Sequence, residues 1–226
     1  MQIDVSHPGS FAVATLRLAP QESARAEGGA MVAMSTDMRI ETKAQGGLLR
    51  SLGRSALGGE SFFLNTFTAG PSGGLLQLAP NLPGDVTVLN PSTVGAYLVH
   101  SGSYLGSDTG VDVKTKWGGA RGFFAAHDLV LLHCSGGNQL VVSSYGAIDH
   151  FALGPGESVT IDTGHVVAFS EGIGYSTRKV GGLKSTLLSG EGLVCDFRGP
   201  GEILMQTRNL GALAEWVREQ VPTQRN

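Results

Sequence analysis

An internal repeat constrains the fold of this chain more strongly than any other feature of its sequence. Five local signals recur in one order, three times, with the copies offset by roughly 63 to 72 residues. The order is a proline turn that contains an acid, a strand-like run, a glycine pair followed by a base, an acid before an apolar run, and a closing turn with its strand. Five signals in one order are hard to attribute to chance, so we interpret the chain as one plan used three times.

The copies are defined by matched positions along the chain. The proline turns are Pro20-Gln21-Glu22, Pro83-Gly84-Asp85 and Pro155-Gly156-Glu157. The strand-like runs that follow them are residues 31–35, 97–101 and 166–170. The glycine pairs with their bases are Gly46-Gly47 with Arg50, Gly118-Gly119 with Arg121, and Gly181-Gly182 with Lys184. The acids before the apolar runs are Glu60, Asp128 and Glu191, and the closing turns begin at Gly73, Gly136 and Gly199.

Glycine and β-prone runs indicate that each copy consists of strands joined by tight turns. Glycine accounts for 34 of 226 residues, about twice its usual share of about 7%, and it recurs at the junctions of all three copies. A unit of about 70 residues buries too little surface for comfortable stability alone. We therefore expect an all-β fold in a single composite domain, 1–226, with repeats at about 1–80, 81–150 and 151–208 around a pseudo-threefold axis.

Only the end of the chain predicts a helix, over residues 209–221. Asn209 is a suitable N-cap, Leu210, Leu213, Trp216 and Val217 recur at helical spacing, and Pro222 ends the pattern. We expect this short C-terminal helix to pack its apolar stripe on the β body.

The charge balance, the cysteines and the first residues bound the class of protein. Charged residues are 15% of the chain and the net charge is −3, which gives no electrostatic case for binding nucleic acid. The two cysteines, Cys134 and Cys195, are too few for a disulfide framework and are expected to be buried free thiols. With no secretory signal and no apolar run long enough to span a bilayer, we expect a cytoplasmic protein.

Several glycine-rich motifs together resemble a known family. They are residues 28–34, 59–65, 144–148, 153–158 and 190–193, followed by Gly199-Pro200-Gly201 and Gln206-Thr207-Arg208. In this order they are similar to the mitochondrial-biogenesis family named for altered inheritance of mitochondria, over about residues 3 to 221. The resemblance implies a threefold duplication of β-sandwich-like units related to the tryptophan RNA-binding attenuation protein. It implies a scaffold role for a bacterial member, with no catalytic residues to carry over, and it does not imply RNA binding.

The residue types that usually carry chemistry form no familiar constellation. The six histidines, His7, His100, His127, His133, His150 and His165, lack metal-ligand spacing, so we expect no metal and no cofactor. Cys134 follows His133, but neighbours on a strand point to opposite faces, which favours a structural thiol. Neither a nucleophile elbow nor a phosphate-binding glycine loop occurs.

Two sets of residues remain as candidates for binding. Arg50, Arg121 and Lys184 occupy matching positions, so a threefold arrangement would bring three cations together to hold a phosphate or carboxylate. The alternative, which we favour, is that each base solvates a turn. The segment from Leu48 to Leu57 is apolar with two bases and could touch a membrane surface or a partner, although a cap over the β body is favoured.

The sequence therefore predicts a non-catalytic structural or interaction protein. We expect self-association, with a trimer favoured, because the chain has few charges and many potential sheet edges. Proteins tend to cover or pair such edges. The alternative is a small-ligand binding protein for an anion or a lipid headgroup. An enzyme of unknown chemistry is the third possibility.

Overall fold

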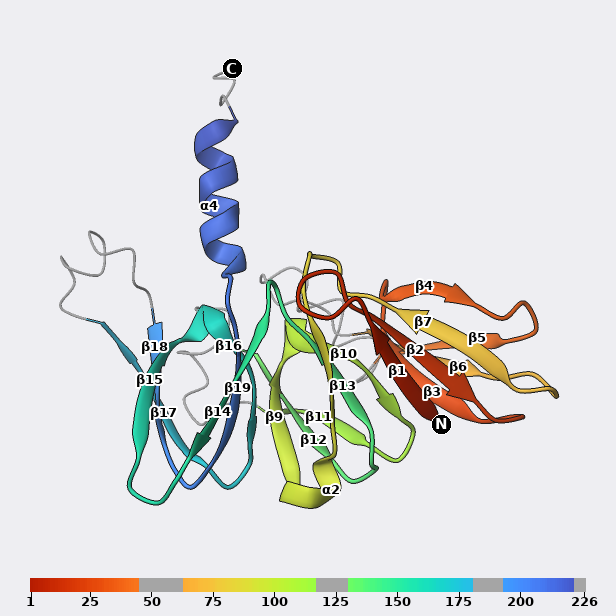
Figure 1. The fold of residues 1–226 in the computed structure, drawn as a ribbon, viewed down its shortest axis with the longest axis horizontal. Helices are drawn as coiled ribbons and strands as arrows, with labels where there is room; N and C mark the ends of the chain where they lie inside the picture. The colour runs from red at the N-terminus through yellow and green to blue at the C-terminus, as the bar shows by residue number, and fades with distance from the viewer. Residues whose placement is uncertain (45–62, 117–129, 181–192, 222–226) are drawn as a thin grey trace.

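The protein folds into antiparallel β-sheets with one short helix at its C-terminal end. The structure, a computed structural model, describes residues 1–44, 63–116, 130–180 and 193–221. Figure 1 shows the strands gathered into three groups in a row, from the N-terminal group at one end to the group around β15, β17 and β18 at the other. The sequence prediction of an all-β fold with a short C-terminal helix is confirmed.

The strands are short and follow one another closely along the chain. They are β1 (Gln2–Ser6), β2 (Val13–Leu18), β3 (Ser23–Glu27), β4 (Met31–Met34), β5 (Arg39–Ala44), β6 (Phe63–Thr68), β7 (Gly74–Leu78), β8 (Val86–Leu89), β9 (Ala96–His100), β10 (Tyr104–Asp108), β11 (Asp112–Lys116), β12 (Leu131–Ser135), β13 (Leu140–Ser143), β14 (Ile148–Leu153), β15 (Ser158–Asp162), β16 (Val166–Ser170), β17 (Gly174–Lys179), β18 (Leu193–Arg198) and β19 (Gly201–Gln206). The helical elements are the short turns α2 (Pro91–Val94), η1 (Ser101–Ser103) and η2 (Thr163–His165), and the helix α4 (Leu210–Gln220).

These strands form four sheets. The strand orders are β1-β2-β7-β4, then β5-β6-β3-β10-β13-β8, then β11-β12-β9-β16-β19-β14, and finally β15-β18-β17. The two six-stranded sheets each contain a ladder between strands that are far apart in sequence, β3 with β10 and β9 with β16. These two ladders join the three groups of Figure 1 into one body.

One pairing pattern recurs along the chain. β7 lies between β2 and β4, β13 between β8 and β10, and β19 between β14 and β16. In each case the second ladder has a bulge, at Met31/Ala33, Tyr104/Gly106 and Val166/Ala168. Similarly, β6 lies between β3 and β5, β12 between β9 and β11, and β18 between β15 and β17.

The interior consists of three hydrophobic clusters between successive sheets. The first contains Leu16, Phe67 and Leu76, and the second contains Tyr104, Leu140 and Val142. The third is built around Phe169 and Phe197. Leu105 and Val141 belong to the first cluster while their strand neighbours belong to the second. Because β10 and β13 are buried on both faces, β13 reads Leu140-Val141-Val142 without alternation, and the buried Ser107 of β10 is hydrogen-bonded to the Tyr104 hydroxyl.

Helix α4 forms as expected but does not pack as expected. Asn209 caps it, since its side-chain oxygen accepts hydrogen bonds from the backbone N–H groups of Gly211 at 2.8 Å and Ala212 at 3.4 Å. However, α4 contains no buried residue, Trp216 is 59% exposed, and Figure 1 shows the helix projecting away from the sheets. The expectation that its apolar stripe lies on the β body is therefore wrong, because amphipathic spacing shows which face is apolar but not what covers it.

Two of the three repeated acids fix the turns that contain them. The carboxylate of Glu22 accepts the backbone N–H of Ala19 at 2.7 Å, and that of Glu157 accepts the N–H of Gly154 at 2.7 Å. Both turns precede an equivalent strand, β3 or β15. Asp85 instead precedes β8 and accepts the N–H groups of Gly9 and Val86. Of the three strand-like runs matched in the sequence, residues 31–35 and 166–170 contain β4 and β16, whereas residues 97–101 fall mostly on β9.

Candidate functional site

The residues predicted to bind an anion cannot be located in the structure. Arg50, Arg121 and Lys184 lie outside the described residues, as do the segment from Leu48 to Leu57 and His127. The anion cluster and the membrane-contact segment therefore stay predictions. Within the described residues, the candidate surfaces are a polar cleft and the two ends of the row of sheets.

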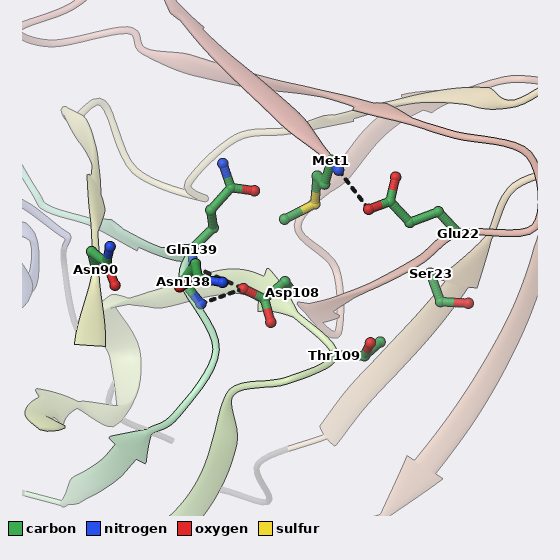
Figure 2. A pocket seen from close by; sticks show the side chains of 8 residues that line it. All are labelled: Met1, Glu22, Ser23, Asn90, Asp108, Thr109, Asn138 and Gln139. Carbon is green, nitrogen blue, oxygen red and sulfur yellow. Dashed lines mark hydrogen bonds and ion pairs between the residues drawn. The ribbon is translucent and has the colours of Figure 1, made fainter. Parts of the chain in front are cut away.

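A polar cleft of about 570 Å³ lies where the first two groups of strands meet. Its wall comes from the turns before β3 and α2, the end of β10 and the turn before β13, as Figure 2 shows. The lining residues are Met1, Glu22, Ser23, Asn90, Asp108, Thr109, Asn138 and Gln139. The lining is largely polar and includes two carboxylates.

Glu22 is held at one side of this cleft by hydrogen bonds to its charged form. Its Oε1 accepts the N-terminal ammonium of Met1 at 2.5 Å, and its Oε2 accepts the N–H of Ala19. These contacts, the ammonium first and the backbone N–H second, lower the pKa of Glu22 below its usual value. The nearby Asp108 carboxylate acts in the opposite direction and raises that pKa.

Asp108 is occupied by the backbone. Its Oδ1 accepts the N–H of Gly110 at 2.7 Å, and its Oδ2 accepts the N–H groups of Asn138 and Gln139 at 2.8 Å each. Asn90, across the cleft, caps α2 through the N–H of Ser92. The polar groups of the cleft therefore hold turns together, and its two carboxylates disfavour an anionic ligand.

Three histidines within the described residues have separate partners, and that of His165 is the backbone oxygen of Gln206, 2.6 Å from its Nδ1. Nε2 of His133 lies 2.9 Å from a carboxylate oxygen of Glu171, and Nε2 of His150 lies 2.9 Å from one of Glu202. Glu202 also accepts the hydroxyl of Tyr97, whose pKa is raised, chiefly by burial. Within the described residues no three His, Cys, Asp or Glu side chains converge as a metal site would require.

Both cysteines are buried free thiols, as predicted. Cys134 lies in the second hydrophobic cluster and Cys195 in the third. Burial raises the pKa of each thiol to about 12. His133 points away from Cys134 toward Glu171. The thiols therefore have the properties of small core residues and not of nucleophiles.

The ends of the row of sheets carry the most unusual surface. β4 ends the first sheet and β15 ends the last one. Met31 and Val32 on β4 are 41% and 56% exposed, although both are large and apolar. In contrast, β10 and β16, which carry the same bulge, are buried almost throughout. Sequence reasoning missed this surface; the signal that could have found it is the similar position of β4, β10 and β16 in the recurring pairing pattern.

Helix α4 adds an apolar surface next to β15. Its exposed side chains include Leu210, Trp216 and Val217. Asn209, its N-cap, donates to the carboxylate of Asp162 at the end of β15. None of the helices within the described ranges is long and apolar enough to cross a membrane.

Comparisons with known proteins agree with the resemblance found in the sequence. The family described as "Mitochondrial biogenesis AIM24" matches residues 3–208. A Streptococcus pyogenes serotype M6 protein, named only as uncharacterized, is 30% identical over 100% of this chain and 88% of its own length. The crystal structure of protein SPYM3_0169 from Streptococcus pyogenes superposes with a TM-score of 0.81 at 28% identity, covering 97% of this chain and 99% of that one. The chain belongs to the mitochondrial biogenesis AIM24 family.

Proposed function

We propose that this protein is a non-catalytic structural module that works by associating with copies of itself. The observation that carries the proposal is the presence of two incompletely covered sheet edges, β4 and β15, at opposite ends of one chain. Edge strands present unpaired backbone groups, which proteins tend to cover or pair. A chain with an open edge at each end is suited to building an assembly.

The proposal includes three repeated β-sandwich-like units within the chain. The recurring strand order, with a bulge at the same step of each unit, supports it. On this basis the third unit begins with β14 (Ile148–Leu153) rather than at residue 151. β1 is an additional strand that covers β2 in the first unit. The units form a row joined by β3–β10 and β9–β16, and the described ladders do not link β15 to β4 into a closed threefold ring.

Exposed apolar side chains support association over an isolated chain. Met31 and Val32 lie at one end of the row, and Leu210 and Trp216 lie near the other. Grouped apolar residues on a surface mark interaction sites more often than single ones do. A trimer is the assembly we propose first, and the protein is proposed to act in the cytoplasm.

The direct test is the mass of the untagged protein in solution. Light scattering should give a multiple of the 23.4 kDa chain, three times that mass for a trimer. A mass of one chain at micromolar and higher concentrations would contradict the proposal. Binding of phosphate at Arg50, Arg121 and Lys184 is a separate prediction, which the absence of a thermal shift at millimolar phosphate would contradict.

A further inference from the structure

The ladders inside the chain show how its two open edges would be paired. β3 is paired with β10, and β9 is paired with β16. By position in the recurring pattern, β4 corresponds to β10 and β16, while β15 corresponds to β3 and β9. Among the described strands, β4 therefore lacks the neighbour that β10 and β16 have. In the same way, β15 lacks the neighbour that β3 and β9 have.

The two internal ladders have the same register. Gly106 lies opposite Ala26 in one, and Ala168 lies opposite Val99 in the other. Ala33 corresponds to Gly106 and Ala168, because each of the three follows the bulge. Through their partners on β6, β12 and β18, Ala26 and Val99 correspond to Ile161. Transfer of this register places Ala33 opposite Ile161, which puts Met34 opposite Thr160 and Ser35 opposite Val159.

The backbone groups of both edges point in the directions that this register needs. The N–H of Ser35 donates to Leu75 on β7, so the N–H and C=O of Met34 face away from β7. On β15, the C=O of Glu157 accepts the N–H of Gly199, and by alternation the N–H and C=O of Thr160 face away from β18. Met34 and Thr160 can therefore exchange two hydrogen bonds as a directly opposed pair.

The internal junction supplies a third bond of the same kind. The N–H of Glu171 donates to the C=O of Ala96 at 3.0 Å just beyond the β9–β16 ladder. Thr36 and Ser158 occupy the corresponding positions at the open edges. They would make the same bond in the transferred register.

Side-chain size and exposure fit the same pairing. The residue after the bulge is small in all three strands, and a Cβ on Gly106 would meet the Arg25 carbonyl on the neighbouring strand at 2.8 Å. At the bulge, Leu105 and Val167 are completely buried, whereas Val32 is 56% exposed. The register would bring Val32 beside the end of β15 where α4 begins. An apolar side chain that is buried at both internal junctions is thus left in solvent on a single chain.

We propose that β4 of one copy of this chain pairs antiparallel with β15 of a second copy, with Met34 opposite Thr160. The result is a seven-stranded sheet, β17-β18-β15 from one copy and β4-β7-β2-β1 from the next. The interface is head-to-tail, so each copy uses β4 on one side and β15 on the other. This inference rests on the proposed self-association and adds the strands and the register.

Other sheet edges are poorer candidates for the same reason. Among the described strands, β5, β11 and β17 end their sheets in all three units, and β8 and β14 end theirs in two, since β1 covers β2 in the first. An edge that is open in more than one unit is an edge that the fold tolerates. β4 and β15 are open only where the row of units stops.

Disulfide trapping tests the register. In the double variant Met34→Cys/Thr160→Cys, opposed residues have Cα atoms about 4.5 to 5.5 Å apart, within reach of a disulfide. Mild oxidation with oxidised glutathione should link the chains into multimers on a non-reducing gel. Each single variant should remain one chain, because a head-to-tail interface never opposes two copies of one residue. The pair Met34→Cys/Ser176→Cys, with its second cysteine on β17, is the matched control and should also remain unlinked.

The outcomes separate this inference from the proposed function. Multimers in the double variant alone support the β4–β15 register. The register would be overturned, and self-association left standing, by either of two results in a protein whose mass is a multiple of one chain. One is disulfide linkage of the single variant Met34→Cys, and the other is linkage of the control pair to the same extent as the double variant. A one-chain mass would overturn both. If the cysteine variants fold poorly, a lysine substitution tests the interface instead. Val32→Lys should dissociate the assembly, and the control Val88→Lys, on the β8 edge, should not. Equal masses in solution for the two variants would overturn the interface.

Discussion

Phe169 is the residue whose truncation should cost the most stability in the third hydrophobic cluster. It is completely buried on β16, which lies between β9 and β19 in the sheet. Its ring centroid lies 4.8 Å from that of Tyr175 and 5.0 Å from that of Phe197. Such tilted and edge-to-face pairs add about 0.5–1.5 kcal/mol beyond the burial of area.

Replacement by alanine removes these contacts and leaves a cavity. Phe→Ala changes in cores typically cost about 3–5 kcal/mol, and the two ring pairs place Phe169→Ala at about 4 to 5 kcal/mol. A chain of this length loses about 2–4 °C of melting temperature per kcal/mol, so the midpoint should fall by about 8 to 20 °C. Urea unfolding followed by circular dichroism, at one protein concentration throughout, measures the free energy of unfolding. The fixed concentration matters because association shifts apparent stability.

Phe11 provides the matched control. It is 72% exposed, and Phe11→Ala should change the free energy of unfolding by less than about 0.5 kcal/mol. If Phe169→Ala costs no more than Phe11→Ala, the third cluster is not a packed core. The stack of three clusters would then be the wrong description of the interior.

Three further changes test other parts of the structure. Because burial raises the pKa of both thiols to about 12, neither cysteine should react with a thiol reagent at pH 8 in the native protein, and both should react in denaturant. Fast labelling of the native protein would contradict this. Because the pKa of Glu22 is lowered in the folded state, its ionised form stabilises the fold above the unfolded-state value of 4.5, and this contribution is lost as the pH falls through the lower folded-state value. The difference in unfolding free energy between wild type and Glu22→Gln should therefore shrink on acidification. A difference that does not change with pH would contradict this. Gly84→Ala should lower the free energy of unfolding by at least about 1–3 kcal/mol, because its Cβ would overlap the Ser144 carbonyl oxygen. Gly172→Ala, with open space around its Cβ, should lie within about 0.5 kcal/mol of wild type. Equal unfolding free energies for the two variants would refute the close approach at Gly84.

Local sequence signals were sufficient for the individual elements. The alternation in Ser158–Asp162 predicts β15, and its inward residues Val159 and Ile161 pack in the third cluster. Asn209 and Pro222 bracket a helix that the structure places at Leu210–Gln220. These predictions succeed because caps, turns and period-2 patterns act over a few residues.

The arrangement of the strands into sheets was harder to predict. Pro-x-Glu turns precede β3 and β15, whereas the similar-looking Pro83-Gly84-Asp85 precedes β8, and β9 is preceded by α2 (Pro91–Val94). The exposure of Trp216 and Val32 depends on which neighbour is present, and local periodicity contains no information on that. The predicted cation cluster of Arg50, Arg121 and Lys184 stays untested, because it lies outside the described residues.

Amide hydrogen exchange of the assembled protein tests the pairing of β4 with β15 most directly. If the two strands pair, the N–H groups of Met34 and Thr160 should exchange slowly in wild type and quickly in Val32→Lys, with the β3–β10 ladder protected in both. Rapid exchange at Met34 and Thr160 in the wild-type protein, at a concentration where its mass exceeds one chain, would contradict the pairing.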